Sequence, residues 1–532
     1  MLSSMSSVPG NVFLDCAAQN PDAGANSTFM LQCISDTYQN AEESSAANVH
    51  SFLLVVCGAL IFFMQAGFAM LCAGSVRLKN VQNTMLKNLL DACGAALAFF
   101  LLGYGIAFGG NDDEGAADQK TFIGTSDYAS VGTSSALWFY QYTFSATSVT
   151  IVAGTLAERC QMAAYLCYSA VVAGFIYPVV AHALWSHSGF LSHSNNNPFL
   201  NSGVIDFAGG AVVHLTGGLV ALIATCILGP RRGRFYDAQG EPLESPKEFP
   251  GHSVALQLLG TMVLWFGWYG FSPGSALLLG PNSNFGIVAA NAAVSTALSG
   301  AAGGVTALFS NMWIEERRSG EPHFSIGMAM NGALSGLVAS TSGCAVLEPG
   351  LAIVTGLIAG WLYMWSSSFL LRIRIDDAVN AIPVHMFNGA WGLLATGLFA
   401  SPEKMEVTFG YSNHPGLFYS FRNGGVDAAL FANQLVGLLF VTGWCLFTML
   451  PFFIWLNYMG WLRADSLEEL VGLDLSYHGG SGAGNMGAVK KEYVDAYNRH
   501  KSALRKRKTP NLSSSDDLEG SDAATMAAGT KS

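Results

Sequence analysis

The sequence predicts an all-α membrane protein, and three observations point to this fold class. Only 11% of the 532 residues are charged, against roughly 25% in a soluble domain, and 51% are hydrophobic. Apolar runs of about 20 residues, the length of a helix that spans a bilayer, recur along the chain. Glycine is abundant, with 60 residues, as in helices that pack closely within membranes. The composition excludes a cytosolic enzyme, a disordered chain and a protein that binds nucleic acid.

Eleven apolar runs are predicted to be transmembrane helices, because none has the period-two pattern of a barrel strand. They cover approximately 50–74, 85–109, 136–158, 162–184, 204–229, 252–271, 284–310, 325–343, 350–371, 382–400 and 431–458. This membrane domain, 48–460, follows a polar N-terminal segment, 1–47. A mixed charged and apolar stretch, 461–498, comes after it, and the Ser- and Asp-rich residues 499–532 are predicted to form a disordered tail.

The positions of Lys and Arg predict the orientation in the membrane. The first 76 residues contain neither, and Arg77, Lys79 and Lys87 follow the first span at once. Twelve basic residues fall in the predicted inner loops and three in the outer loops. We therefore expect a multi-pass protein of the plasma membrane, with its N-terminus outside and its C-terminus in the cytosol. Residues 1–46 lack the basic and apolar regions of a cleavable signal peptide.

With this topology the outer face is acidic. The outer segments hold 14 acidic and three basic residues, so their net charge equals the −11 of the whole chain. An acidic outer face attracts cations, although salt screens the effect beyond about 8 Å.

The N-terminal segment contains two candidate modification sites. Cys16 and Cys33 are candidates for a disulfide in an extracellular segment, and Asn26 begins an N-glycosylation sequon. The other eight cysteines lie in or beside apolar runs, where small buried side chains are expected. Their spacing does not indicate zinc.

Asp206 and His214 are the most informative ionisable residues, because both fall within the fifth predicted span. Eight residues separate them, roughly two helical turns or about 12 Å, which places them on nearly the same face. Two interpretations of Asp206 stay open: an N-cap that accepts hydrogen bonds from free backbone N–H groups, and part of a cation path. A single histidine in an apolar span is often a hydrogen-bonded core residue.

His385 lies in the tenth predicted span, five spans after His214. Because five is an odd number of spans, two successive five-helix halves would be inverted relative to each other in the membrane. Inverted repeats commonly place the substrate site at their interface. We therefore expect two inverted repeats plus an eleventh helix, with both histidines facing a central pore. A haem bound by the two histidines is the rival hypothesis, but the spans hold almost no Arg for propionates. No metal or cofactor is expected.

The motifs resemble those of a known family. Residues 203–218, GVIDFAGGAVVHLTGG, are similar to the signature of the ammonium transporters of the Amt/Mep/Rh superfamily. Further segments of the same resemblance are 153–159, 174–185, 265–275, 376–392 and 472–480, the last matching the family's cytosolic regulatory tail. The resemblance extends from about 48 to 480. It implies a transporter and not an enzyme, of the Amt branch, with eleven spans and a homotrimeric assembly in membrane lipid.

The resemblance also assigns roles to individual positions. Ammonium, or its analogue methylammonium, is recruited at the outer site by the face of an aromatic ring and by a hydroxyl, above an acid. Two stacked phenylalanines close the vestibule, and twin histidines line a hydrophobic pore. The matching residues are Trp185, Ser275 and Asp206 at the outer site, Tyr140, Phe144, Phe271 and Trp268 along the vestibule, and His214 and His385 in the pore.

Some positions depart from the family pattern. Tyr140 stands where Phe is usual and is expected to add a hydroxyl to the entrance. The run 386–388, Met-Phe-Asn, replaces Gly-Gly-Cys and is expected to narrow the lower pore or to change helix packing. In the tail, Gly472 and Asp474 match the regulatory motif, and Ser476 matches a phosphorylatable Thr that shuts the pore. An unmodified, ordinary Ser476 is the alternative.

The leading hypothesis is therefore an ammonium transporter. It captures ammonium outside, removes a proton near Asp206 and Trp185, and passes ammonia between His214 and His385. The histidines either relay the proton or only shape the pore. An ammonium sensor with little flux and an Rh-type gas channel for ammonia or carbon dioxide are the alternatives.

Overall fold

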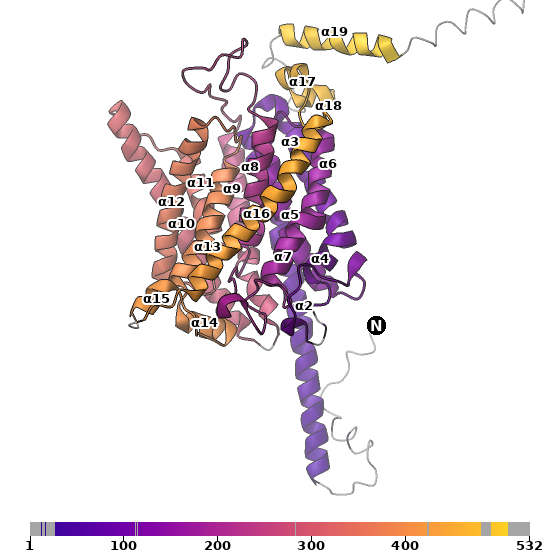
Figure 1. The fold of residues 1–532 in the computed structure, drawn as a ribbon, viewed down its shortest axis with the longest axis vertical. Helices are drawn as coiled ribbons and strands as arrows, with labels where there is room; N and C mark the ends of the chain where they lie inside the picture. The colour runs from indigo at the N-terminus through magenta and orange to yellow at the C-terminus, as the bar shows by residue number, and fades with distance from the viewer. Residues whose placement is uncertain are drawn as a thin grey trace, which may run out of the picture.

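The computed structural model describes residues 12, 16, 27–111, 113, 115–281, 283–422, 425–479 and 491–508. These residues form a bundle of helices (Figure 1), and within them β-pairing is limited to isolated bridges. The predicted all-α class is thus confirmed for the described part of the chain.

The first half of the bundle begins with α2, a helix of 49 residues whose N-terminal half projects beyond the bundle (Figure 1). Several later helices are interrupted by short π-helical turns, labelled η4, η7 and η9. In order the elements are α2 (Ser27–Ser75), α3 (Val81–Ala98), η4 (Phe99–Gly103), α4 (Tyr104–Phe108), α5 (Ser135–Thr155), α6 (Met162–Val171), η7 (Val172–Ile176), α7 (Tyr177–Trp185), η9 (Gly210–Leu215) and α8 (Thr216–Leu228).

The second half contains one further π-helical turn, η11, and the long helix α16, which crosses the bundle obliquely (Figure 1). Its elements are α9 (Val254–Phe271), η10 (Gly274–Leu279), α10 (Phe285–Ser319), α11 (Ile326–Thr341), α12 (Pro349–Arg372), η11 (Ile382–Phe387), α13 (Asn388–Phe399), α14 (Pro402–Phe409), α15 (Leu417–Arg422), α16 (Ala429–Tyr458), α17 (Ser466–Val471), α18 (Leu473–His478) and α19 (Lys491–Lys508). Short 3-10 turns, η3 (Leu78–Asn80), η5 (Ala116–Asp118), η6 (Tyr128–Ser130) and η8 (Phe199–Asn201), lie in the loops.

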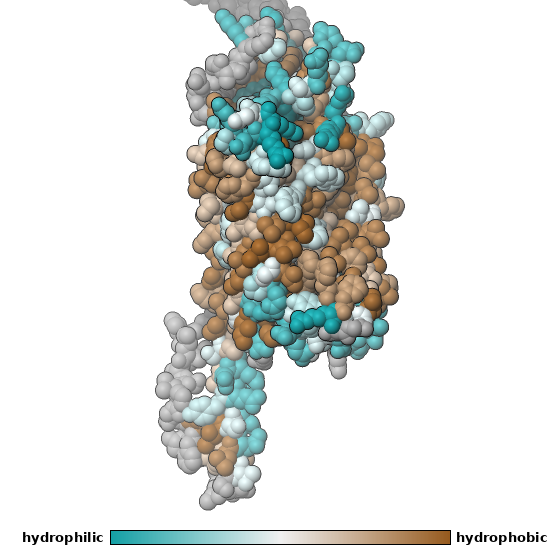
Figure 2. All heavy atoms as spheres, turned by 90° about the vertical axis from the view of Figure 1, so that its left-hand side faces the viewer, coloured by the Kyte–Doolittle hydropathy of each residue, from teal (hydrophilic) through white to brown (hydrophobic). Residues whose placement is uncertain are grey.

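Eight helical stretches in the described residues are long and apolar enough to cross a membrane. They coincide with eight of the predicted spans. The other three, 136–158, 325–343 and 382–400, fall on α5, α11 and the η11–α13 pair, so the count of eleven stays a prediction. The surface agrees with a membrane position, because a hydrophobic band lies between two hydrophilic ends (Figure 2).

Two boundaries differ from the sequence prediction. Residues 27–47 of the predicted polar segment are helical, because α2 begins at Ser27 and not at the membrane. The disorder predicted from 499 onward is wrong for 499–508, which belong to α19. Lys, Arg, Ala and Leu dominate that stretch, and their high helix propensity explains the difference.

Close helix contacts depend on glycine. A Cβ at Gly260 of α9 would overlap the backbone nitrogen of Leu71 in α2. Likewise, a Cβ at Gly336 of α11 would overlap the carbonyl oxygen of Ser299 in α10. Membrane helices approach closely where side chains are absent, and this explains the abundance of glycine in the sequence.

Candidate functional site

Asp206 caps the helical segment that carries His214. Its Oδ2 accepts hydrogen bonds from the backbone nitrogens of Ala211, at 2.9 Å, and Val212, at 2.8 Å. The His214 nitrogen donates to the Gly209 oxygen five residues back, at 3.2 Å, which is the π-helical pattern of η9. The N-cap interpretation is thus present in the structure. Asp206 Oδ1 has no hydrogen-bond partner among the described residues, although the side chain is buried.

Asp377 caps the helical segment that carries His385, as Asp206 caps the segment of His214. Its Oδ2 accepts from the Ile382 nitrogen at 2.7 Å, and its Oδ1 accepts from the Val379 nitrogen at 3.1 Å. His385 then lies in the π-helical turn η11. From the sequence, Asp377 is only part of the motif 376–392, without a role of its own. The shared eight-residue interval before each histidine was the signal that could have found it.

The imidazoles of His214 and His385 meet in the centre of the bundle. Their Nδ1 atoms are 3.2 Å apart and share a hydrogen bond, and the rings lie nearly parallel, at 19°. His214 also stacks on Trp268, with ring centroids 5.1 Å apart. Both histidines are buried. The juxtaposition predicted from the sequence is therefore found, on elements 171 residues apart.

Two phenylalanine rings lie directly above this pair. The ring centroids of Phe144, on α5, and Phe271, on α9, are 4.3 Å apart, and Phe271 is 5.4 Å from His214. Trp185 meets Phe144 edge to face at 5.7 Å. The vestibule residues named in the sequence analysis thus form one continuous aromatic column from Trp185 to His214.

Tyr140 does not add its hydroxyl to the entrance, so that expectation is wrong. The side chain is fully buried, and its hydroxyl donates to the Gly270 carbonyl oxygen at 3.3 Å. The ring packs against Phe144 at 5.0 Å. Tyr140 therefore supports the upper phenylalanine, while its polar end ties α5 to α9.

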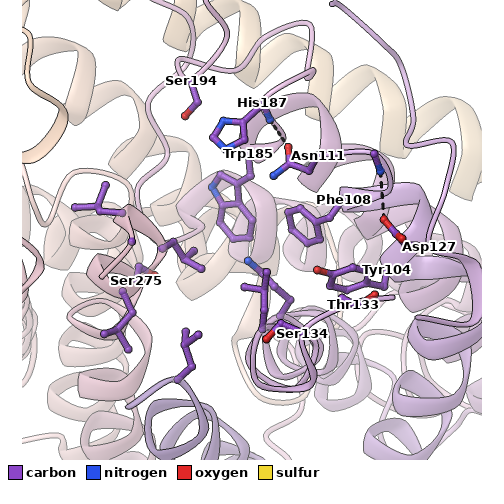
Figure 3. A pocket seen from close by; sticks show the side chains of 18 of the residues that line it. Tyr104, Phe108, Asn111, Asp127, Thr133, Ser134, Trp185, His187, Ser194 and Ser275 are labelled. Carbon is purple, nitrogen blue, oxygen red and sulfur yellow. Dashed lines mark hydrogen bonds between the residues drawn. The ribbon is translucent and has the colours of Figure 1, made fainter. Parts of the chain in front are cut away.

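A pocket of about 520 Å³ lies at the Trp185 end of the aromatic column, and Figure 3 shows part of its lining. We call it the outer pocket, after the side of the membrane predicted for it. Trp185, Asp206 and Ser275 line it together. The Trp185 indole is fixed, since its Nε1 donates to the Asp206 carbonyl oxygen at 2.6 Å. The Ser275 hydroxyl donates to the Phe271 carbonyl oxygen at 2.9 Å, which leaves the hydroxyl oxygen available as an acceptor.

Sequence reasoning missed most of this pocket, because its walls come from loops and helix ends without a periodic pattern. Figure 3 shows the rings of Phe108 and Trp185 at the same opening. Asp127 is held there by the Gly110 nitrogen at 3.3 Å. Other lining residues include His50, Tyr104, Asn111, His187, His193 and Phe409.

Below His385 a small inner cavity of about 20 Å³ remains, roughly the space of one water. The run 386–388 does not line it. Phe387 packs edge to face on Trp365 at 5.9 Å, and Asn388 Nδ2 donates to the Pro383 carbonyl oxygen at 3.0 Å. Of the two expectations for this run, altered helix packing is the one that the contacts support.

A buried ion pair joins the loop after α8 to the loop after α12. Asp376 accepts from the Arg231 backbone nitrogen and Nε, both at 2.8 Å, and from its Nη2 at 2.9 Å. Burial alone raises the pKa of the Asp376 carboxyl. The hydrogen bonds from Arg231 and the charges of Arg159 and Arg231 outweigh that effect and hold the pKa below its usual range.

The tail segment named in the sequence analysis packs against η3 and the first turn of α3 in its own chain. Asp474 accepts from the backbone nitrogens of Asn83, at 2.8 Å, and Gln82, at 3.1 Å. Gly472 has a φ of 102°, and a Cβ there would lie 2.6 Å from the Lys79 carbonyl oxygen. The Ser476 hydroxyl donates to the Gly472 carbonyl oxygen at 3.0 Å.

The N-terminal segment is described only in part. The sulfur atoms of Cys16 and Cys33 are bonded to each other, as the sequence analysis expected of an extracellular pair. Asn26, the glycosylation candidate, lies outside the described residues.

The fold and the pocket together define a helical membrane protein with a pocket beside Trp185 and a column of aromatic rings leading to two buried histidines. The family model for the Ammonium Transporter Family matches residues 52–483. Ammonium transporter 1 member 3 of Solanum lycopersicum is 40% identical over 451 residues, which are 82% of this chain and 94% of the relative. Ammonium transporter Amt2 of Archaeoglobus fulgidus is 41% identical over 431 residues, 80% of this chain and 86% of the relative.

Two solved structures have the same fold. A sensor Amt protein superposes with a TM-score of 0.68 and 28% identity, covering 82% of this chain and 99% of that chain. The crystal structure of Candida albicans Mep2 superposes with a TM-score of 0.65 and 24% identity, covering 79% and 87%. The chain belongs to the Ammonium Transporter Family.

Proposed function

We propose that this protein transports ammonium by capturing the cation in the outer pocket and passing ammonia through the histidine pore. The observation that carries the proposal is the order in which the pocket, the two phenylalanines and the two histidines follow one another. Trp185, Asp206 and Ser275 line the pocket, Phe144 and Phe271 close it, and the two histidines follow directly beneath. The relatives that share the family are ammonium transporters by name.

Capture is explained by the chemistry of the pocket. Ammonium resembles potassium in charge and size but carries four directional hydrogen-bond donors. The Trp185 face offers a cation–π contact, the Ser275 oxygen accepts a hydrogen bond, and Asp206 supplies negative charge. These groups replace water around ammonium better than around potassium, which has no protons to donate.

The pore below favours a neutral species. The two phenylalanine rings are in contact, and the imidazoles beneath them are buried, so a bare ion there would lose its hydration without full compensation. Burying an uncompensated charge costs several kcal/mol or more. Ammonium therefore leaves a proton near Asp206, and ammonia continues between His214 and His385.

The proposal includes the membrane arrangement. The outer pocket faces the extracellular side, and the tail lies in the cytosol. Eleven spans form two inverted five-helix repeats and a final helix. The protein is a homotrimer at the plasma membrane. The capping of His214 by Asp206 and of His385 by Asp377 supports the repeats, because equivalent contacts occur in both halves.

The test separates ammonia passage from proton passage. His214→Ala, His385→Ala and the double variant are expressed in oocytes and in uptake-deficient cells, and ammonium-evoked current and methylammonium uptake are measured separately. A proton relay through the histidines predicts that the double variant loses current. Current that survives in the double variant rejects the relay, and absence of ammonium transport by the wild-type chain rejects the proposed function.

Sensing is the second candidate function, and the likeness to the sensor Amt protein favours it. A sensor binds ammonium in the same outer pocket but supports little flux. Growth of uptake-deficient cells at low ammonium distinguishes the two, because a sensor with little flux does not restore growth.

A further inference from the structure

The outer pocket is much larger than ammonium needs. Its volume of about 520 Å³ lies within the roughly 300–1,000 Å³ of sites for organic ligands, whereas ammonium is about the size of a water, whose share of the liquid is roughly 30 Å³. Only Trp185, Asp206 and Ser275 are needed for the substrate. The rest of the lining therefore forms surface that ammonium does not use.

One wall of this unused part is apolar and begins beside Asp206. Phe207 follows Asp206 in the chain, and its ring centroid is 6.5 Å from that of Phe409 at the end of α14. Phe409 in turn packs on the His193 ring at 4.5 Å. Both phenylalanines line the outer pocket, as do Leu54 and three leucines of η10, Leu277, Leu278 and Leu279.

Two acceptor oxygens of the same pocket have no hydrogen-bond partner among the described residues. They are Asp206 Oδ1 and Gln141 Oε1, and both side chains are nearly fully buried, with 1% and 3% exposed. Buried acceptors without a partner are costly, and an N–H donor satisfies them. A cation with several N–H groups at one end and an apolar body matches both these acceptors and the apolar wall.

We propose that the outer pocket binds primary alkylammonium cations longer than methylammonium and that these occupy it without crossing. The –NH3⁺ group donates to Asp206 and Gln141, and the alkyl chain lies along Phe207 and Phe409. Phe144 and Phe271, in contact beneath, close the pocket to a longer chain. The inference extends the proposed function from the substrate to a class of ligand that blocks it.

The experiment compares n-butylammonium with tetramethylammonium, which has the same charge but no N–H group. In cells expressing the full chain, n-butylammonium is expected to inhibit methylammonium uptake competitively and to evoke no current itself. Its inhibition constant is expected to be at least about tenfold below that of tetramethylammonium, since each hydrogen bond from a charged group is worth about tenfold or more. Equal inhibition constants, non-competitive inhibition or a current carried by n-butylammonium would overturn the inference.

Two variants locate the alkyl chain. Phe409→Ala is expected to raise the inhibition constant of n-butylammonium about tenfold, the effect of leaving roughly two methylene groups in water, and by a larger factor than it raises the KM for methylammonium. Phe421→Ala is the matched control, because Phe421 is half-exposed on α15 and does not line the outer pocket. An unchanged inhibition constant in Phe409→Ala contradicts the placement along Phe409. If Phe409→Ala fails to reach the surface, Phe409→Leu keeps an apolar wall and is expected to retain inhibition.

Calorimetric titration of the purified wild-type chain with n-butylammonium separates this inference from the proposed function. Saturable binding without any ammonium transport supports the inference and rejects the proposed function. Ammonium transport without n-butylammonium binding rejects the inference alone.

Discussion

Asp206 and Asp377 occupy equivalent positions before His214 and His385. Each precedes its histidine by eight residues, and each Oδ2 accepts a backbone N–H from the residue five positions on. The two carboxylates differ in surroundings, because Asp206 lines the outer pocket and Asp377 lies beside Asp376, which is paired with Arg231.

This relationship predicts different outcomes for the same substitution. Asp206→Asn and Asp377→Asn both keep an oxygen that can cap the helix. Only at position 206 does the proposed capture of ammonium also require the negative charge. We expect Asp206→Asn to lower methylammonium uptake at least about tenfold and Asp377→Asn to retain most of it. Asp377→Ala removes the cap and should cost about 0.5–2 kcal/mol in stability, measured as thermal unfolding of the purified protein. Equal uptake by the two Asn variants would contradict this assignment.

Gly218 sets the distance between α8 and η11. A Cβ at Gly218 would lie 2.6 Å from the Met386 Cα and would overlap the Met386 nitrogen. Backbone cannot yield as a flexible side chain does, so Gly218→Ala is expected to cost about 1–3 kcal/mol or more and to reduce the yield of folded protein. Size-exclusion chromatography with a fluorescent fusion measures that yield.

Gly443→Ala is the control for that substitution. Gly443 lies within α16, and a Cβ there meets no atom within 4 Å. Replacing a helical glycine by alanine gains roughly 0.5–1 kcal/mol where space allows, so the variant is expected to match or exceed wild-type stability. A loss as large as that of Gly218→Ala would show that contact with η11 is not the cause.

Ser476 is predicted to control the tail. A phosphate there adds about −1.5 to −2 charge two residues from Asp474, whose carboxylate accepts hydrogen bonds from the backbone in the first turn of α3. We expect Ser476→Asp to release this contact and to abolish uptake, while Ser476→Ala loses one hydrogen bond, worth about 1 kcal/mol, and stays active. Surface biotinylation ensures that equal amounts of protein are compared. Undiminished uptake by Ser476→Asp would reject the regulatory role.

His193 is expected to make stability depend on pH. Burial lowers the pKa of His193 to about 4, below the roughly 6.5 of an exposed histidine in the unfolded chain. The unfolded state therefore binds more protons between these values. Stability is complete above about pH 6.5 and decreases as the pH falls toward about 4.

Thermal unfolding of the purified protein between pH 4 and 8 measures this dependence, with about neutral pH as the reference. His193→Asn should make the unfolding temperature less dependent on pH between about pH 4 and 6.5. His323→Asn, at an exposed position, should leave the profile as it is in the wild-type chain. A profile that His193→Asn does not alter would contradict the assignment to His193.

The apolar runs and the His–Gly motifs predicted the helical class and the meeting of His214 with His385. Hydrophobic length and motif spacing are local properties, so a single sequence displays them. The outer pocket was harder to predict, because Phe108, Asp127 and Phe409 come from helix ends and loops whose positions depend on packing. The burial of Tyr140 was missed for a similar reason, since its hydroxyl partner, Gly270, is 130 residues away.

Because of the π-helical turns η9 and η11, the contact between the two histidines is sensitive to the insertion or deletion of single residues. Each turn holds one residue more than an α-helix requires over the same rise, and the two turns carry His214 and His385. Deleting Leu215 moves His214 into the place of Leu215 ahead of α8, a shift of about 100° around the helix axis. The two imidazoles then no longer meet, although each residue type is still present. Insertions or deletions in these two turns are therefore expected to disturb the contact between His214 and His385 more than most substitutions do.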